Sequence, residues 1–237
     1  MMPGISRAHA AIVALSGVLA ATSARAEIGR VYHPYVEPHR SAIELRGLLP
    51  LESERETANI QQFQLGYERS ISDRVGVEAY IAGHKPDDES LAFDAVELET
   101  RWQITEQGEY ASDWGMLLEV ERNTDIPEWA ITAWVLWEKE FGRSSLAINT
   151  GLNYEFDPPV DDPLEFKLRS QWRYRLSRVF EPAIEFYYDA STTGLGPAAV
   201  GDIALGKRKL HWELAFIAGL RQRTPAHNIR FMVEFEF

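Results

Sequence analysis

The 237-residue chain contains no cysteine, which excludes a disulfide framework and any thiolate metal site. Beyond the N-terminal region it has no apolar run of the roughly 20 residues that a membrane-spanning helix needs. Acidic residues outnumber Lys and Arg by 36 to 24, for a formal charge of −12. A nucleic-acid partner would demand a basic face, so we expect none. No phosphate-binding Gly-rich loop, HExxH or EF-hand pattern occurs, and we expect no cofactor.

The first 26 residues have the organisation of a secretory signal peptide. Arg7 is followed by a short apolar stretch over 11–21, and Ala24 to Ala26 form a small-x-small cleavage site. We predict cleavage after Ala26, the alternative being a retained N-terminal anchor. Loss of Arg7 and Arg25, without loss of an acid, would change the formal charge from −12 to −14. The predicted domain then covers residues 27–237, with an extended, Pro-containing lead over 27–40.

The last residues of the chain alternate strictly between two kinds of side chain. Strict alternation is the period-2 signature of a strand with a different environment on each face. An exposed aromatic edge strand would promote aggregation, whereas closure of a membrane barrel removes the edge. The ending resembles the C-terminal strand of bacterial outer-membrane barrels, which closes on a terminal Phe. One face carries Ile229, Phe231, Val233, Phe235 and Phe237, and the other carries Arg230, Met232, Glu234 and Glu236.

Similar alternation recurs along the chain and predicts an all-β fold: an antiparallel up-and-down transmembrane barrel of about 12 strands. An even count is typical of single-chain bacterial barrels, and most segments have about the 9–11 residues of a tilted spanning strand. The predicted strands are Ala42–Leu49, Ile60–Arg69, Val75–His84, Phe93–Ile104, Trp114–Arg122, Trp129–Phe141, Leu146–Phe156, Leu164–Leu176, Phe180–Tyr188, Leu195–Gly206, Leu210–Leu220 and Asn228–Phe237.

The connections alternate in length, as they do in barrels with short periplasmic turns and longer outer loops. Ser70–Arg74, Gly142–Ser145, Ser177–Val179 and Lys207–Lys209 are short. Thr105–Asp113 falls in the same series and is longer. If both termini lie in the periplasm, the remaining loops, which contain Pro, Gly and Asp, face outward.

Aromatic residues favour a membrane barrel over a soluble β-sandwich or a lipocalin-like barrel, which remains the alternative. Amphipathic rings prefer the headgroup level of a bilayer, although ordinary strand propensity also enriches Trp and Tyr. The residues predicted to form aromatic girdles are Trp114, Trp129, Trp137, Trp172, Trp212, Tyr154, Tyr174 and Tyr188.

The inward faces are strongly charged. The candidate lumen-lining residues are Glu97, Glu99, Arg101, Glu119, Glu121, Glu138, Glu140, Lys167, Arg169, Arg173, Arg175, Glu185, Glu213 and Arg230. Across the closing seam we expect Glu44 and Arg46 to meet Arg230, Glu234 and Glu236. Two interpretations stay open. The charges form ion pairs that fill the interior, or they line a narrow water-filled channel whose acidic arc favours cations and polar solutes. The channel is the favoured interpretation.

An enzyme is the third interpretation. His211 and Glu213 share a face and could act as base and orienter, but no inward Ser is apparent beside them. We therefore predict no catalytic residues, and a lumen hydrogen-bonding role for His211. His84 with 87–89, and His33 with Glu37 and His39, carry ligand-type side chains, but solvated segments account for them and we predict no metal site.

Phe180–Asp189, Gly196, Pro197, Leu210–Leu220 and the final strand together resemble a broad group of transporter-like bacterial outer-membrane barrels. The resemblance implies the barrel and the outer-membrane compartment, and a transport role by analogy. It also implies outer-membrane lipid and, through Phe231, Phe235 and Phe237, the barrel-assembly machinery as partners. It transfers no substrate and no site residue.

Overall fold

The computed structural model describes residues 28–52, 60–86, 90–124, 128–156, 164–221 and 224–237. Within them, alternating sequence produces twelve strands. The strands are β1 (Ser41–Glu52), β2 (Gln61–Ser70), β3 (Val75–Lys85), β4 (Ala92–Gln103), β5 (Asp113–Asn123), β6 (Trp129–Phe141), β7 (Ser144–Phe156), β8 (Leu164–Tyr174), β9 (Glu181–Tyr188), β10 (Thr193–Leu205), β11 (Arg208–Gly219) and β12 (His227–Glu236). Among these residues no helix is long and apolar enough to span a membrane.

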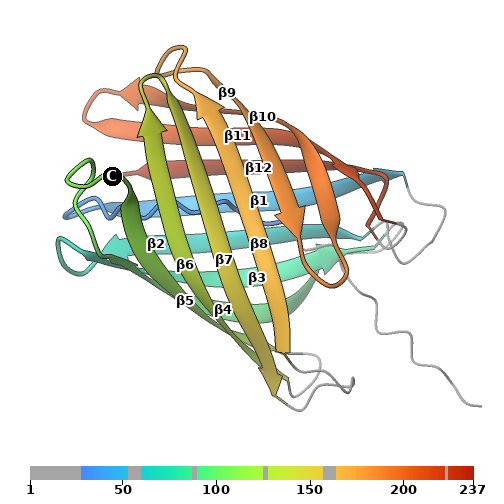
Figure 1. Cartoon of the computed structure of the whole chain (residues 1–237). Coiled ribbons are helices and arrows are strands. Elements are labelled where there is room, and N and C mark those ends of the chain that lie inside the picture. The colour runs from blue at the N-terminus through green and yellow to red at the C-terminus, as the bar shows by residue number, and fades with distance from the viewer. Residues whose placement is uncertain (1–27, 53–59, 87–89, 125–127, 157–163, 222–223) are drawn as a thin grey trace, which may run out of the picture.

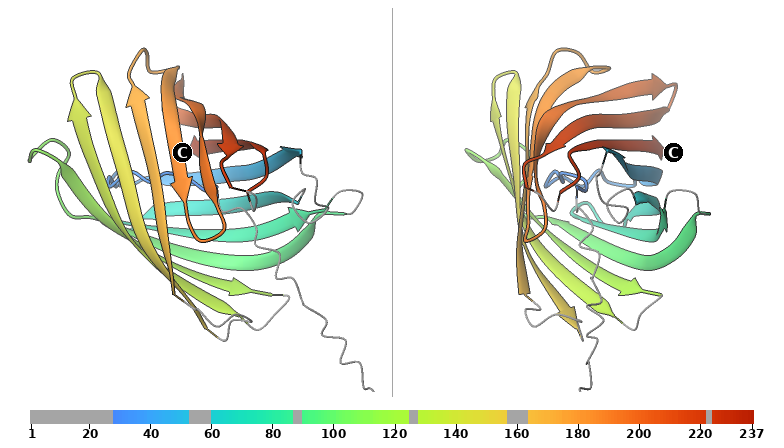
Figure 2. Two further views of the ribbon diagram at one scale, coloured as in Figure 1. Left: turned by 45° about the vertical axis from the view of Figure 1, so that its right-hand side comes forward. Right: turned by 90° about the vertical axis from the view of Figure 1, so that its right-hand side faces the viewer.

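Every strand pairs antiparallel with its neighbours in sequence, and β1 pairs with β12, so the described sheet closes on itself (Figures 1 and 2). This confirms the predicted fold class. The seam runs from Ala42 opposite Glu236 to Glu52 opposite His227, with an irregularity between Pro50 and Glu52. Phe237 lies just beyond β12, where its amide donates to the carbonyl of Ser41 at 2.9 Å. We call this end of the barrel, which holds Ser41 and Phe237, the terminal end, and the opposite one the far end.

The short connections lie at the terminal end. β6–β7 and β10–β11 turn tightly at Gly142 and Gly206, whose φ angles of 63° and 70° suit glycine in tight hairpins. The long connection expected between the fourth and fifth strands is present, from Gln103 to Asp113. It therefore reflects a real irregularity at this end of the barrel rather than an error of register.

The two faces of the sheet differ as predicted from the alternation. Outward side chains such as Trp114, Trp129, Trp172 and Tyr154 are exposed, and inward ones are mostly buried. Trp134 is an inward exception among the tryptophans: it is fully buried, and its ring lies over Gly151, where a Cβ would come within 2.6 Å of it.

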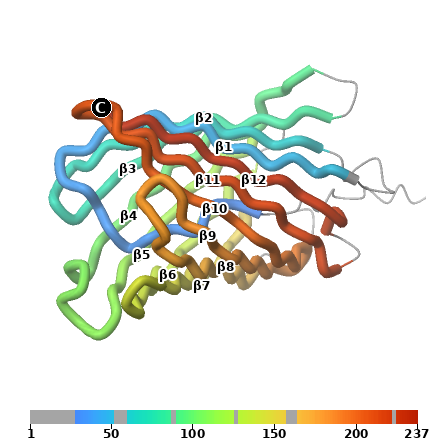
Figure 3. The backbone as a smooth tube through the Cα atoms, turned by 90° about the horizontal axis from the view of Figure 1, so that it is seen from above, coloured from blue at the N-terminus to red at the C-terminus, as the bar shows by residue number. Residues whose placement is uncertain are grey.

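The lead, residues 28–40, lies inside the barrel, and its position is the main finding that the sequence pattern did not anticipate. The chain reverses beside Pro38 and His39, the latter with a left-handed φ of 61°. The lead, drawn in blue, extends from this reversal into the interior of the barrel (Figures 1 and 3). Ile28, Val31 and Tyr32 are buried there.

Small side chains make room for the lead. Ala183 on β9, Ala198 on β10 and Ala215 on β11 line one side of the interior and belong to one apolar cluster with Ile28 and Val31. On the opposite side, a Cβ at Gly115 of β5 would lie 2.9 Å from the Cβ of Pro34. The barrel therefore has a core, and the lead is at its centre.

Candidate functional site: the lumen and its lead

Hydrogen bonds attach the lead to β4, β5 and β7. The amide of Val36 donates to Gln103 Oε1 at 2.7 Å, and the Tyr35 hydroxyl donates to Asp113 Oδ2 at 2.8 Å. Farther in, the carboxamide of Asn149 holds the backbone of Tyr32 at both its amide (2.7 Å) and its carbonyl (2.9 Å). The lead thus has one defined path through the lumen.

Tyr32 joins the lead to the opposite wall of the barrel. Its hydroxyl donates to Glu99 Oε1 at 2.6 Å and accepts from Arg46 at 3.1 Å. Burial raises the pKa of the Tyr32 phenol well above its usual value, and burial likewise raises the pKa of Tyr35. Both phenols therefore remain protonated and act as hydrogen-bond donors to carboxylates.

Arg30 of the lead neutralises acids on three strands. Its guanidinium lies 3.0 Å from Glu44 on β1, 3.7 Å from Glu78 on β3 and 3.8 Å from Glu234 on β12. Glu44 and Glu234 stand directly opposite one another across the seam, an arrangement that repels unless a cation lies between them. The lead supplies that cation.

The seam therefore differs from the sequence-based expectation. Arg46 lies opposite Met232 and pairs with Glu44, Glu78 and Glu99, not with Glu234 or Glu236. Arg230 pairs with Glu185 at 2.5 Å and Glu213 at 2.8 Å instead of reaching β1. Strand pairing sets which residues stand opposite, but a long arginine side chain also reaches acids on strands that are not its direct neighbours.

A row of acids crosses the barrel wall. Glu68, Glu78, Glu99 and Glu119 occupy consecutive paired positions on β2, β3, β4 and β5. Arg101 pairs with Glu68 and Glu78, and Arg46 lies 3.5 Å from Glu99. Glu119 is at the end of this row, and within the described residues no hydrogen bond or ion pair reaches its carboxylate.

A cavity of about 360 Å³ lies beside the lead toward the far end of the lumen. Glu97, Glu119 and Glu121 line one of its walls, with Glu155 nearby on β7. We call Glu97, Glu99, Glu119 and Glu121 the acidic wall. Asp94 is the fifth acid of the lining, and its bases are Arg30, Arg46, Lys167, Arg169 and Arg230. The lining therefore holds as many bases as acids, and the acids lie together on one wall.

Arg169 is held by the lead and by an aromatic ring. Its Nη1 donates to the carbonyl of Arg30 at 3.1 Å, and its guanidinium lies 4.4 Å from the centre of the Trp134 ring. Such a cation–π contact fixes the cation without neutralising it.

Among all buried charged groups of the described residues, by contrast, acids predominate. The buried acids are Glu44, Glu68, Glu78, Asp94, Glu99, Asp113, Glu119, Glu138, Glu185, Asp189, Glu213 and Glu234, and the buried bases are Arg30, Arg46, Arg101, Lys167, Arg169 and Arg230.

The predicted lumen residues divide into three groups. Glu97, Glu119, Glu121, Lys167, Arg169 and Arg230 line the cavity. Glu99, Arg101, Glu138, Glu185 and Glu213 are buried in ion pairs or hydrogen bonds beneath or beside the lead. Glu140, Arg173 and Arg175 lie nearer the terminal end, where Arg175 pairs with Glu140 at 2.5 Å and Arg173 with Glu181 at 3.2 Å.

Three histidines, His33, His84 and His211, contact carboxylates. His211 lies 2.7 Å from Asp202 and 3.2 Å from Glu213, which fits the predicted hydrogen-bonding role. His33 contacts Glu138 at 2.7 Å, and His84 contacts Asp94 at 2.8 Å. The partners of both histidines are therefore strand residues and not the acids that are close to them in the sequence. Residues 87–89, considered with His84, lie outside the described residues.

Sequence reasoning missed the lead as a functional element. Its signal was present in the composition: Arg30, Tyr32 and His33, polar side chains with long reach, stand among the apolar residues Ile28, Val31 and Val36. A solvated linker has no need for such a mixture, whereas a segment buried in a charged lumen requires both kinds of contact.

The strand count, closure and two-faced wall place this protein in a structural class: it has the fold of porin-type outer-membrane β-barrels. No protein-family model matches the sequence, and no curated protein matches it. Solved structures do match. The COG4313 outer membrane channel from Pseudomonas putida F1 superposes with a TM-score of 0.56 at 9% identity, over 89% of this chain and 99% of that one.

The KdgM porin in complex with disordered oligogalacturonate has a TM-score of 0.55 at 9% identity. The match covers 83% of this chain and 98% of KdgM. These matches show a shared fold. At 9% identity they identify neither a solute nor site residues for this protein.

Proposed function

We propose that the protein is a narrow passive channel of the bacterial outer membrane that admits small polar or cationic solutes. The single observation that carries the proposal is the charged cavity inside a closed barrel, which is bounded by the lead and has the acidic wall on one side. In this arrangement the barrel provides the wall, and the lead narrows the path. The resemblance in fold to outer-membrane channels supports the same proposal.

The charge of the lining supports a preference for cations. Fixed charges in a narrow, partly desolvated passage raise the local concentration of counter-ions and repel ions of like sign. Glu97, Glu119, Glu121 and Glu155 line the cavity. Five bases line it too, but three of them, Arg30, Arg46 and Arg230, are paired with carboxylates that do not line the cavity. Oligogalacturonate, the ligand of the KdgM complex, is an anion, and the acidic wall disfavours such a solute here.

Bilayer recordings test the proposal directly. Purified full-length protein in a planar bilayer under a KCl gradient is expected to conduct, with a reversal potential of the sign for K⁺ preference. The double variant Glu121→Gln, Glu155→Gln should lower this preference, because both carboxylates line the cavity. Glu106→Gln is the matched control, since Glu106 is an exposed acid at the terminal end. A folded protein that never conducts, or one that prefers Cl⁻, would overturn the proposal.

One observation favours the second candidate, a structural or interaction barrel with a filled lumen. Arg30 pairs with Glu44, Glu78 and Glu234 on one side of the barrel, and Arg169 on β8 donates to the Arg30 carbonyl, so polar contacts join two walls through the lead. The same recordings separate the two functions, because a filled barrel conducts nothing while remaining folded. Neither candidate requires a catalytic group, and a channel accounts for the lumen better than a lipid-directed enzyme does.

The proposal includes a location and an orientation. The exposed aromatic and aliphatic belt would face outer-membrane lipid, with the terminal end in the periplasm. The closing strand, with Phe231, Phe235 and Phe237, would be presented to the barrel-assembly machinery. Export requires the predicted signal peptide, residues 1–26. Membrane fractionation and the intact mass of the purified protein, which should begin at Glu27, check both points.

A further inference from the structure

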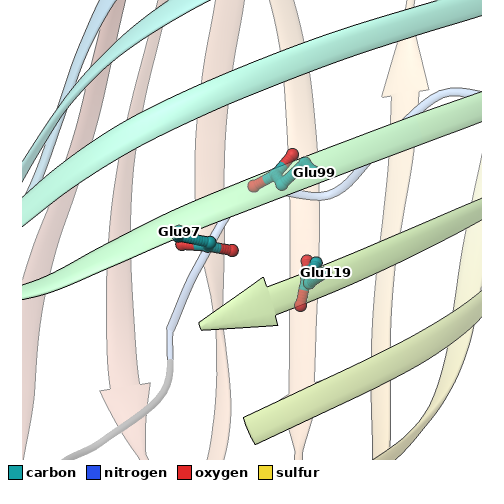
Figure 4. A group of neighbouring side chains, drawn as sticks. All are labelled: Glu97, Glu99 and Glu119. Atoms are coloured by element: carbon teal, nitrogen blue, oxygen red, sulfur yellow. The ribbon is translucent and has the colours of Figure 1, made fainter. Parts of the chain in front are cut away.

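Three carboxylates converge on one point of the acidic wall. Glu97 and Glu99 are inward residues of the same strand, two positions apart, and Glu119 stands opposite Glu99 on β5. Figure 4 shows the three side chains turned toward a common centre, and one oxygen from each lies within 4.8 Å of the others. Glu97 and Glu119 also line the cavity, so the cluster is open to a solute.

Only one of the two carboxylate oxygens of Glu99 has a hydrogen-bond partner among the described residues. Glu99 is fully buried, and its Oε1 accepts from Tyr32 and lies 3.5 Å from Arg46. Its Oε2 is also buried, and within the described residues it has no hydrogen-bond partner. Burial of a carboxylate oxygen without a partner is strongly unfavourable, because the oxygen loses its hydrogen bonds to water and no protein group replaces them. A bound cation would restore the missing interaction.

The neighbouring side chains leave a negative excess. Arg46 is the cation nearest to Glu99, and it is shared with Glu44 and Glu78. Glu97 accepts a hydrogen bond from the neutral amide of Gln64 at 3.1 Å. Three carboxylates at such short range cannot all remain charged in a partly buried site without a further positive charge.

We propose that Glu97, Glu99 and Glu119 form a binding site for a divalent cation, with Ca²⁺ the best fit. Calcium takes oxygen ligands at about 2.3–2.6 Å and accepts irregular geometry, so two of its ligands can lie up to about 5 Å apart. The carboxylate spacing meets this requirement without movement. The cavity leaves room for the waters that complete the coordination shell. The three carboxylates would bind the cation whether or not the barrel conducts.

Terbium luminescence measures the site directly. Tb³⁺ takes the same oxygen ligands as Ca²⁺, and Tyr32, which is hydrogen-bonded to Glu99, is positioned to sensitise it. In full-length protein in detergent, excitation of the aromatic residues is expected to give saturable Tb³⁺ emission that Ca²⁺ displaces. Glu119→Gln should weaken binding roughly tenfold or more, since it removes one of three charged ligands.

Glu121→Gln is the matched control. Glu121 is the next inward acid on β5 and lines the same cavity, but it is outside the triad. Its loss should change the affinity by less than about twofold if direct ligation dominates. Equal weakening by both variants would indicate diffuse attraction of cations and overturn the site, as would non-saturable emission from the wild-type protein. Glu97→Gln provides a second ligand variant if circular dichroism shows that Glu119→Gln is misfolded.

Discussion

Arg30 is the residue on which most of the buried charge balance at the seam depends. It is nearly inaccessible and faces Glu44, Glu78 and Glu234, which are buried as well. Removing one partner of a buried ion pair leaves an uncompensated charge and costs about 3–5 kcal/mol. We expect Arg30→Gln to lower the free energy of unfolding by about this amount, measured by guanidinium titration of the protein in detergent.

The exposed pair of Arg74 and Glu106 gives the control for this variant. The two side chains lie 2.7 Å apart, but both are about half exposed, at 49% and 56%. Solvent-exposed pairs contribute only about 0–1 kcal/mol. Arg74→Gln should therefore leave the free energy of unfolding almost unchanged. If Arg30→Gln and Arg74→Gln lower it by similar amounts, the buried ion pairs of Arg30 stabilise the barrel no more than an exposed pair does.

Two inward glycines on neighbouring strands provide a second test at the residue scale. A Cβ at Gly66 would lie 2.1 Å from the ring of Tyr80, which is buried and hydrogen-bonded to Glu78 and Arg46. Gly66→Ala must displace that ring, and overpacking of this kind costs about 1–3 kcal/mol. At Gly76, by contrast, the nearest atom to an added Cβ is 3.7 Å away. Gly76→Ala should be tolerated in the same unfolding assay, and equal losses would contradict the role assigned to Tyr80.

At the scale of elements, the strands were predictable and the lead was not. In a strand such as β8, polar and apolar side chains alternate between Glu165 and Trp172. This alternation shows which residues face inward and which face outward, without any knowledge of the neighbouring strands. The lead has no such period. Its place depends on contacts such as Tyr32 with Glu99 and Tyr32 with Asn149, which lie 67 and 117 residues apart in sequence.

The same contrast separates the parts of the site that could be predicted. The inward position of Glu97, Glu99 and Glu119 follows from the alternation. Their convergence requires the register of β4 against β5, because a shift by one residue would move Glu119 to the other face. The pairing of Arg230 with Glu185 and Glu213 likewise depends on the relative positions of three strands, β9, β11 and β12, which no local pattern records.

The fixed path of the lead leads to a prediction at the element scale. A Cβ at Gly76 would lie 3.9 Å from both methyl groups of Val36, so thiols at the two positions would be within reach of each other. Because the chain has no cysteine, the double variant Val36→Cys, Gly76→Cys contains a single possible intramolecular pair. Mild oxidation of the folded protein should consume both thiols, as measured by thiol labelling and intact mass.

Each single variant, Val36→Cys or Gly76→Cys, controls for oxidation by other routes and should retain its thiol in the monomer. If the oxidised double variant keeps both thiols reactive while its barrel remains folded, the lead does not lie along β3 in solution. The docked position of the lead would then be wrong.

At the scale of the whole molecule, one segment provides both stability and constriction. The lead contributes Arg30 to the charge balance of the seam, and it fills space that would otherwise belong to the lumen. A barrel without it would be more open and less stable. The two properties are therefore expected to change in opposite directions when the lead is removed, which distinguishes a constricting segment from a purely structural one.

Deletion of residues 29–38 tests this coupling and leaves Arg40, which pairs with Glu68 and Glu236 at 3.4 and 3.2 Å, close to its acids. We expect the single-channel conductance to rise, because the segment between Ile28 and His39 no longer occupies the interior. The guanidinium midpoint should fall, because Glu44 and Glu234 lose Arg30. Arg30→Gln in the full chain is the matched variant: it should reproduce much of the loss of stability with little gain in conductance, since the backbone of the lead remains. A deletion that conducts no better than the full chain, in a barrel shown to be folded by circular dichroism, would mean that the lead does not set the width of the path.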